Sequence, residues 1–140
     1  MNMKTAIIYK TVLGTTKQYA EWLEEEIQAD LLEFDEADKE KLKGYDVIVV
    51  GSGTYATKMP LVGYLKKVWE IIKDKQVVIL AVGAAPADDE MTKKAYQTIP
   101  GEIRERAKYF KLQGKIWKQF ESEVKKENLD PVVDYLKSIQ

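Results

Sequence analysis

The sequence has 140 residues, of which 45% are hydrophobic and 32% are charged, and its net charge is −1. This length and composition are typical of one globular domain, and the near-neutral charge gives no electrostatic support for binding nucleic acid. The chain contains no Cys and no His, which excludes disulfides, Cys- or His-ligated metals, cysteine nucleophiles and the Ser-His-Asp triad. Any redox chemistry must therefore come from a bound cofactor.

The first half of the chain alternates short apolar runs with amphipathic segments. Residues 5–9 predict a buried strand, and apolar residues over 16–27 recur with the spacing of one helix face. A weaker strand is predicted over 30–34 and a short helix over 37–43. The β-branched run at 47–50 is typical of a central strand that is buried on both sides.

The second half continues the same alternation. Pro60 is well placed to open a helix that runs to Ile72, and 76–82 predicts another buried strand. Acidic residues at 88–90 suit the start of the next helix, which the Pro-Gly pair at 100–101 interrupts. Residues 109–112 predict a fifth strand.

The segment 114–128 follows this last strand. Ile116, Phe120 and Val124 recur there at helical spacing, with Trp117 beside them, and predict a helix that covers the end of the sheet. A docking surface for a partner, a quinone or a membrane is the alternative interpretation. After it, Asp130 is predicted to be the N-cap of the last helix, with proline in the first helical position.

Strands that alternate with helices predict an α/β fold, in which a doubly wound parallel sheet is covered on both faces. We expect residues 1–140 to form a single domain with five strands in the order 2-1-3-4-5. In that order strands 1, 3 and 4 are neighbours, and ligands bind at the carboxyl edge near the switch point between strands 1 and 3.

Glycines and hydroxyls gather at that predicted edge. They are Thr11, Gly14, Thr15 and Thr16 after strand 1, Ser52, Gly53, Thr54 and Thr57 after strand 3, and Gly83 after strand 4. The exit of strand 2 carries only Asp35 and Glu36, and that of strand 5 is Gln113-Gly114-Lys115. We therefore expect strands 1, 3 and 4 to serve a ligand, and strands 2 and 5 not to.

The loop at 11–16 suits a phosphate monoester. A helix N-terminus supplies free N–H groups and a favourable dipole, threonine hydroxyls add donors, and Gly14 allows close approach of the backbone. A threonine N-cap with a turn glycine is the alternative. The Walker pattern and GxGxxG after the first strand are absent, and Val50-Gly51 stands where a phospho-acceptor domain needs an aspartate.

Three stretches together resemble the flavodoxin family, whose strand order is the one expected here. Residues 11–16, TVLGTT, fit its phosphate loop, [ST]-x-T-G-x-[ST], at the first, fourth and sixth positions, with Leu13 in place of the usual threonine. Residues 45–55 resemble its third strand and the loop beside the flavin ring, and 81–86 resemble its second ring-side loop. The phrase YFKLQGK is similar to the flavodoxin-domain branch that includes protoporphyrinogen oxidases.

The resemblance implies one FMN, bound without a covalent link. Its phosphate would be held by Thr11, Val12, Leu13, Gly14, Thr15 and Thr16. Its ring would lie between two loops, with contacts from Ser52, Gly53, Thr54, Tyr55, Ala56, Gly83, Ala84, Ala85 and Asp88. Tyr55 is the expected stacking residue. Asp88 and Asp89 are expected to lower the reduction potential.

The main interpretation is an FMN-binding electron-transfer protein that serves redox partner proteins, a reductase and an acceptor, and has no catalytic residue of its own. Two alternatives remain open: an FMN-dependent oxidoreductase for a quinone or porphyrin-type substrate, and a flavin-free interaction module. No apolar run suits a membrane span and no signal peptide is visible, so we expect a cytoplasmic monomer. Peripheral membrane contact is not favoured.

Overall fold

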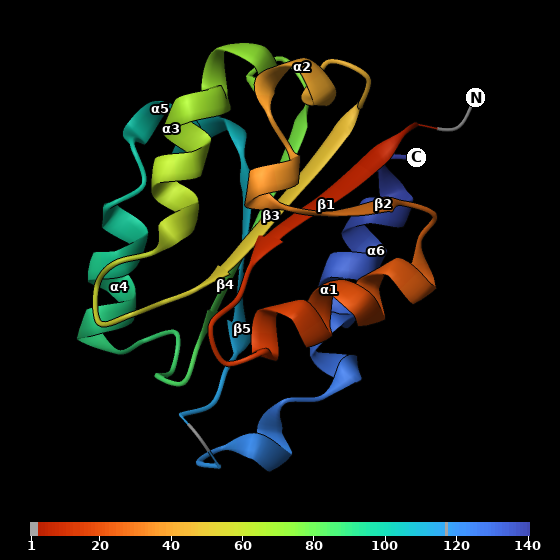
Figure 1. Ribbon diagram of the computed structural model, residues 1–140. Coiled ribbons are helices and arrows are strands. Elements are labelled where there is room, and N and C mark those ends of the chain that lie inside the picture. Colours follow the sequence, from red (N-terminus) through yellow and green to blue (C-terminus); the bar gives the residue numbers. More distant parts are fainter. Residues whose placement is uncertain (1–2, 117) are drawn as a thin grey trace.

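The computed structural model describes residues 3–116 and 118–140, which form a parallel β-sheet between two layers of helices (Figure 1). The strands are β1 (Thr5–Lys10), β2 (Asp30–Glu33), β3 (Val47–Gly53), β4 (Gln76–Gly83) and β5 (Lys108–Gln113). Their order is β2-β1-β3-β4-β5, and every neighbouring pair is parallel. The predicted fold class and strand order are confirmed.

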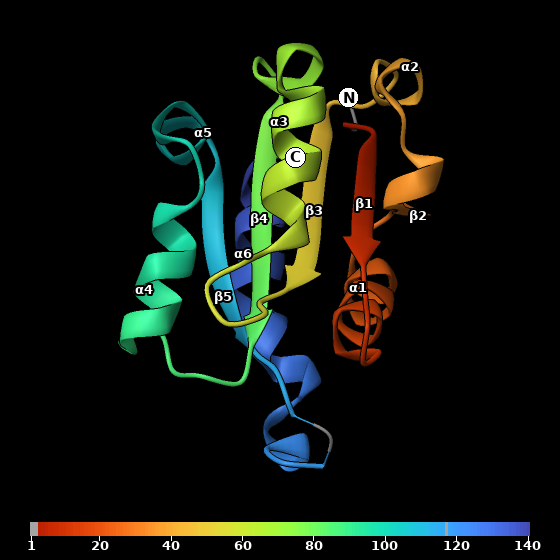
Figure 2. The same ribbon diagram turned by 60° about the vertical axis from the view of Figure 1, so that its left-hand side comes forward.

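The helices cover both faces of the sheet. One layer holds α1 (Thr15–Glu26) and α6 (Asp130–Ser138), and the other holds α2 (Lys39–Leu42), α3 (Pro60–Ile72), α4 (Glu90–Gln97) and α5 (Gly101–Arg106) (Figures 1 and 2). The connecting segments contain the short 3-10 helices η1 (Phe34–Glu36), η2 (Glu121–Glu123) and η3 (Lys126–Leu129). Within the described ranges, no helix is long and apolar enough to cross a membrane.

Alternate residues of the central strands build two separate cores. In β1, Ala6 and Ile8 pack in the core under α3, whereas Ile7 and Tyr9 pack in the core under α1 and α6. All four side chains are buried. Burial on both faces explains why the central strands are nearly continuous apolar runs, as a doubly covered parallel sheet requires.

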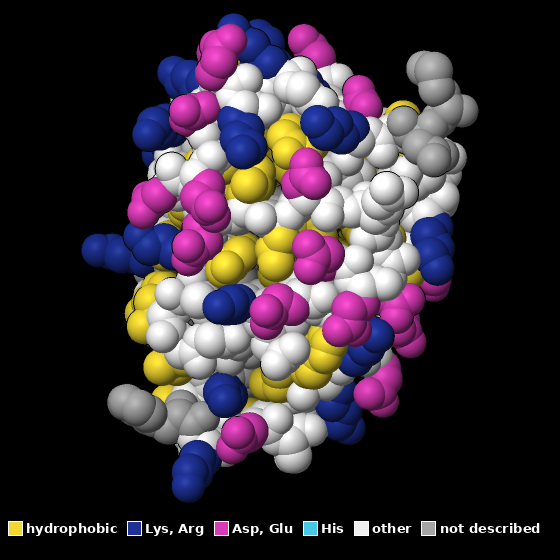
Figure 3. All heavy atoms as spheres, turned by 45° about the vertical axis from the view of Figure 1, so that its right-hand side comes forward, with side chains coloured by type: hydrophobic (Ala, Val, Ile, Leu, Met, Phe, Trp, Pro, Cys, Tyr) yellow, Lys and Arg dark blue, Asp and Glu magenta, His cyan; other side chains and the backbone are white. Residues whose placement is uncertain are grey.

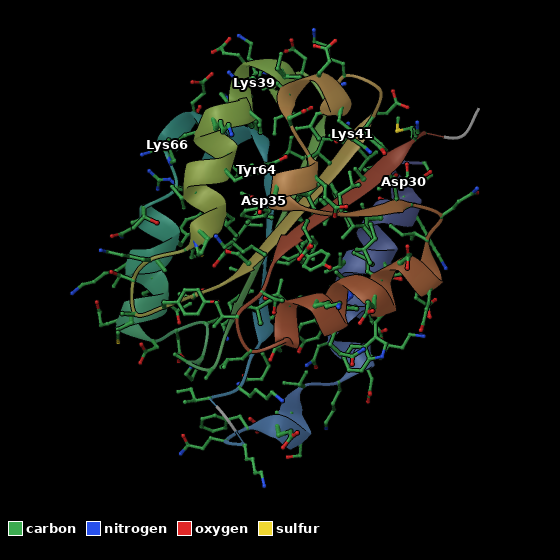
Figure 4. All side chains as sticks on the ribbon, viewed as in Figure 1. Asp30, Asp35, Lys39, Lys41, Tyr64 and Lys66 are labelled. Atoms are coloured by element: carbon green, nitrogen blue, oxygen red, sulfur yellow. The ribbon has the colours of Figure 1, made fainter. Side chains whose placement is uncertain are left out.

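Tyr64 connects α3 to the turn that follows the edge strand β2, through a ring contact and a hydrogen bond. Its ring stacks on Phe34 with 4.5 Å between centroids, and its hydroxyl donates to the carbonyl of Ala37 at 2.6 Å. Figure 4 shows Tyr64 on α3 beside the turn that carries Asp35. Burial, and after it the charge of Asp38, raises the pKa of the Tyr64 phenol. The phenol therefore remains a donor at neutral pH.

Several element ends differ from the sequence prediction. β3 continues past Val50 to Gly53, so Ser52 lies inside the strand. Gly101, predicted only to interrupt a helix, opens α5. Asp130 is not the N-cap of α6 but its first residue; Leu129 is the N-cap and already has helical backbone angles. The chain thus enters α6 directly from η3, without an extended residue that could cap it.

The segment 114–128 does not form the predicted helix. It contains an antiparallel bridge between Ile116 and Gln119 and then two 3-10 helices. The backbone of Phe120 is left-handed, with φ of 65°, which breaks the helical repeat. Ile116 and Phe120 are both exposed, and Trp117 of that prediction lies outside the described residues. The segment lies beyond the sheet, next to its carboxyl edge (Figures 1 and 2).

Polar contacts to α1 hold this segment in place. The Tyr19 hydroxyl donates to the carbonyl of Gln113 at 2.6 Å and accepts from Nδ2 of Asn128 at 2.9 Å. Lys126 forms ion pairs with Glu25 at 3.0 Å and with Glu26 at 2.9 Å. Val124 of the segment also packs against the core under α1 and α6, so both polar contacts and apolar packing hold the segment against the fold.

Charges of both signs are mixed on the surface. On the face shown in Figure 3, Lys and Arg side chains alternate with Asp and Glu side chains, and hydrophobic atoms appear between them. This mixture agrees with the net charge of −1.

We predict that Ser52→Ala lowers the free energy of unfolding by about 1–2 kcal/mol, because a buried N–H loses its partner. Ser52 is 0% exposed, and its Oγ accepts from the backbone N–H of Leu61 at 3.2 Å, in the first turn of α3. Urea unfolding followed by circular dichroism measures the change. The control is Ser138→Ala, which removes an exposed hydroxyl; equal effects from the two variants would contradict the prediction.

Candidate functional site

A cavity of about 350 Å³ opens at the carboxyl edge of the sheet, within the size range of small-molecule sites. The loops after three strands line it with Thr11, Val12, Leu13, Thr15 and Thr16 after β1, with Gly53, Thr54, Tyr55 and Ala56 at the end of β3, and with Gly83, Ala84 and Ala85 at the end of β4. The structure therefore brings most of the predicted site residues together in one place.

Three predicted site residues do not line the cavity. Gly14 is exposed in the turn before α1. Ser52 is buried, and its hydroxyl is engaged by Leu61. Asp88 is exposed on the loop before α4. Of the three, Gly14 still affects the cavity, because its backbone sets the course of the loop.

Strand β5 contributes to the cavity, and the prediction that it would not is wrong. Residues from β5 and its exit that line the cavity are Tyr109, Lys111, Gly114, Lys115 and Ile116, and α4 adds Met91, Thr92 and Ala95. Gly114 and Lys115, which follow β5, line the cavity together with Tyr109 and Lys111, which lie within the strand. Among the described residues that line the cavity, none comes from β2 or its exit.

The first loop is shaped by Thr11 and Gly14. The N–H of Gly14 donates to Oγ1 of Thr11 at 2.9 Å. Gly14 has φ of 87°, a left-handed conformation that favours glycine. Helix α1 begins immediately after it, with the N–H of Gln18 donating to the carbonyl of Gly14 at 3.0 Å. The N–H groups of Thr15 and Thr16 precede that first helical bond, so they are available to a ligand.

Thr15 carries a buried hydroxyl that lacks a hydrogen-bond partner among the described residues. Its side chain is 7% exposed and lines the cavity. A buried polar atom without a partner is costly and needs an explanation. Together with the helix N-terminus, this hydroxyl makes the β1 end of the cavity suitable for an anion such as phosphate.

The loop after β3 forms a tight turn from Tyr55 to Lys58. The two residues exchange backbone hydrogen bonds of 2.8 and 3.0 Å, and Ala56 between them is left-handed, with φ of 58°. The Tyr55 side chain folds back over Gly53: its Oη lies 2.7 Å from the point where a Cβ of residue 53 would stand. Because glycine has no side chain, residue 53 leaves room for the Tyr55 ring, which forms part of the cavity wall.

Hydrogen bonds hold the loop after β4 against β5. The carbonyl of Gly83 accepts from the N–H of Gly114 at 2.8 Å and from Nζ of Lys111 at 2.6 Å. The carbonyl of Ala84 accepts from Nε2 of Gln113 at 3.0 Å. A Cβ on Gly114 would stand 3.1 Å from backbone atoms of Gly83. The close approach requires glycine at position 114, and the hydrogen bond to Ala84 gives Gln113 its role at the end of β5.

The acidic residues before α4 have separate roles in the structure. Asp89 is the N-cap of α4 and accepts from the N–H of Met91 at 2.9 Å. The neighbouring Asp88 is exposed. That these carboxylates lower a flavin potential remains a prediction. Over the ranges 3–116 and 118–140, no group of three or more acidic side chains could hold a metal ion.

Apolar side chains are exposed around the mouth of the cavity. They are Val12, Leu13, Tyr55, Met91 and Ile116, with exposed fractions from 40% to 67%. Exposed apolar groups that share one opening are typical of a binding surface. Leu13, which replaces the usual threonine, thus belongs to the rim.

Comparison with solved structures gives many matches of the same fold. The flavodoxin of Fusobacterium nucleatum bound to flavin mononucleotide has a TM-score of 0.72 at 14% identity, covering 98% of each chain. A flavodoxin from the domain Archaea has a TM-score of 0.61 at 18% identity, covering 96% of this chain and 99% of that one. An FMN-dependent NADH-azoreductase from Bacillus anthracis has a TM-score of 0.62 at 11% identity, covering 99% of each.

Comparison with curated proteins gives no match. Comparison with family profiles gives a match to the flavodoxin domain over residues 6–135, which is nearly the whole chain. The strand order, the position of the cavity and this match agree. The chain belongs to the flavodoxin domain family.

Proposed function

We propose that the protein binds FMN in the cavity and transfers electrons between partner proteins. The observation that carries the proposal is the buried, unpartnered hydroxyl of Thr15 at the N-terminus of α1. It supplies a donor where the family places the phosphate, at one end of a cavity of suitable size. The Fusobacterium flavodoxin with bound flavin mononucleotide supports the choice of cofactor.

The β1 end of the cavity would hold the phosphate without a basic side chain. The Thr15 and Thr16 hydroxyls and the N–H groups of the first turn of α1 are uncharged donors, and the helix dipole adds a partial positive charge. Thr11 is already an acceptor for the N–H of Gly14, which leaves its own O–H free to donate. Three hydroxyls thus remain for the phosphate, although Leu13 provides none.

The loops after β3 and β4 would flank the ring. They touch each other: a Cβ on Gly83 would lie 3.4 Å from the Cβ of Thr54, and the N–H of Thr54 donates to the carbonyl of Val82 at 2.8 Å. The Tyr55 ring, which covers Gly53, and the Thr54 side chain, which packs against Gly83, would form the wall against which a flat ring lies. When bound, FMN would supply one- and two-electron redox chemistry. The protein orients the ring and sets the charge around it.

The exposed apolar rim supports exchange with proteins. Val12, Tyr55, Met91 and Ile116 surround the opening through which electrons would pass. Such a rim can pack against the surface of a reductase or an acceptor. This favours the role of a carrier.

We predict that the protein binds FMN at micromolar concentration or tighter and that Thr15→Val weakens binding by at least tenfold. Losing one hydrogen bond to a charged phosphate costs about 1.5–3 kcal/mol. Quenching of FMN fluorescence during titration measures both affinities. Thr98→Val, outside the cavity, is the matched control and should bind as the wild type does. Failure of the wild type to bind at this concentration would refute the proposed cofactor.

We predict that Tyr55→Ala weakens FMN binding several-fold, because an aromatic pair contributes about 0.5–1.5 kcal/mol beyond its buried area. Tyr55→Phe keeps the ring and serves as the control. The same fluorescence titration gives the two dissociation constants. If the alanine and phenylalanine variants bind equally well, Tyr55 does not stack on the ring.

We predict that NADPH reduces the flavin-loaded protein only when a flavodoxin reductase is present, because a carrier receives electrons at its rim from another protein. Absorbance of the flavin, followed with and without the reductase, measures the rate. Rapid direct oxidation of NADH or NADPH with a quinone as acceptor would instead identify an oxidoreductase. Heat-denatured reductase is the control.

A further inference from the structure

Lys111 is a charged residue of the cavity that is not among the residues proposed to hold the phosphate or to flank the ring. It lies on β5, on the face of the sheet that α4 covers, and its side chain lines the cavity. The residue is half-buried, and its Nζ donates to the carbonyl of Gly83 at 2.6 Å. The ammonium group therefore touches the loop that would flank the ring.

The charge of Lys111 is poorly compensated by the protein. Among the described residues, no ion pair includes Lys111. Burial lowers the pKa of its ammonium group, which is the sign of a cation moved out of water. A carbonyl oxygen alone is a weak partner for such a cation. The surroundings of Lys111 thus favour a bound group that carries a negative charge.

The charges that line the cavity all have one sign. Lys111 and Lys115 are the charged side chains among the described lining residues, and no carboxylate is among them. Lys115 forms an ion pair with Glu121 at 3.6 Å. Asp88 is exposed, and Asp89 caps α4. The ring end of the cavity therefore carries a positive charge from Lys111 that these acidic residues do not neutralise by direct contact.

We propose that Lys111 stabilises the negative charge of the reduced flavin and so raises the midpoint potential of the bound cofactor. Addition of two electrons and one proton converts the neutral flavin ring into a monoanion. A nearby positive charge lowers the free energy of that anion and has little effect on the neutral oxidised ring. This inference rests on the proposed function, since it requires FMN in the cavity.

The test compares the two redox states of bound FMN in variants of residue 111. Lys111→Met removes the charge and the donor, Lys111→Gln removes the charge and keeps a donor, and Lys111→Arg keeps the charge. Lys108→Met is the matched control, because Lys108 lies on the same strand over the rings of Phe110 and Tyr135, away from the cavity. Each flavin-loaded protein is reduced with dithionite at pH 7 beside a reference dye, and the affinity for oxidised FMN is measured by fluorescence.

We expect Lys111→Met and Lys111→Gln to weaken binding of reduced FMN relative to oxidised FMN by about tenfold, which lowers a two-electron potential by about 30 mV. Lys111→Arg and Lys108→Met should stay near the wild type. Because Lys111→Gln retains the hydrogen-bond donor, a role limited to supporting Gly83 would leave its potential unchanged.

Three results would overturn the inference while leaving the proposed function intact. They are an unchanged potential in Lys111→Gln and Lys111→Met, an equal loss of affinity for both redox states, and a shift of the same size in Lys111→Arg or Lys108→Met. If the wild type binds no FMN, the proposed function fails, and this inference fails with it.

Discussion

The parallel pairing of the strands at fixed register is the constraint on which the site depends. Lys10 lies opposite Ser52, Gly53 lies opposite Val82, and Gly83 lies opposite Gln113. This register makes the loops after β1, β3 and β4 leave the sheet at nearly the same level, beside the end of β5. Backbone pairing of the strands therefore brings together the segments that line the cavity, which are far apart in the chain.

Close packing between these loops is the second requirement, and glycine makes it possible. A Cβ on Gly51 would stand 3.4 Å from the methyl group of Thr16, so helix α1 packs closely against β3. Gly114 approaches the backbone of Gly83 still more closely. The loops on both sides of the cavity are thus attached directly to the sheet, which favours a site that is largely formed before any ligand binds.

Much of the fold and part of the site could be predicted from the sequence, because they depend on local patterns. The apolar runs predict the strands. Pro60 marks the start of α3, and Gly14 precedes the start of α1. The course of 114–128 could not be predicted, because hydrogen bonds of Tyr19 and Asn128 override its helical spacing. Lys111 was missed because a lysine that alternates with apolar residues in a strand is typical of a solvent-facing position.

The hydroxyl of Tyr19 joins three distant parts of the chain: α1, the end of β5 through Gln113, and the segment before α6 through Asn128. Helix α1 carries the β1 end of the cavity, and Gln113 also holds the loop at Ala84. One buried phenol thus links the two ends of the cavity through hydrogen bonds. A change at this position would therefore affect both ends of the cavity, although Tyr19 itself is not among the described residues that line it.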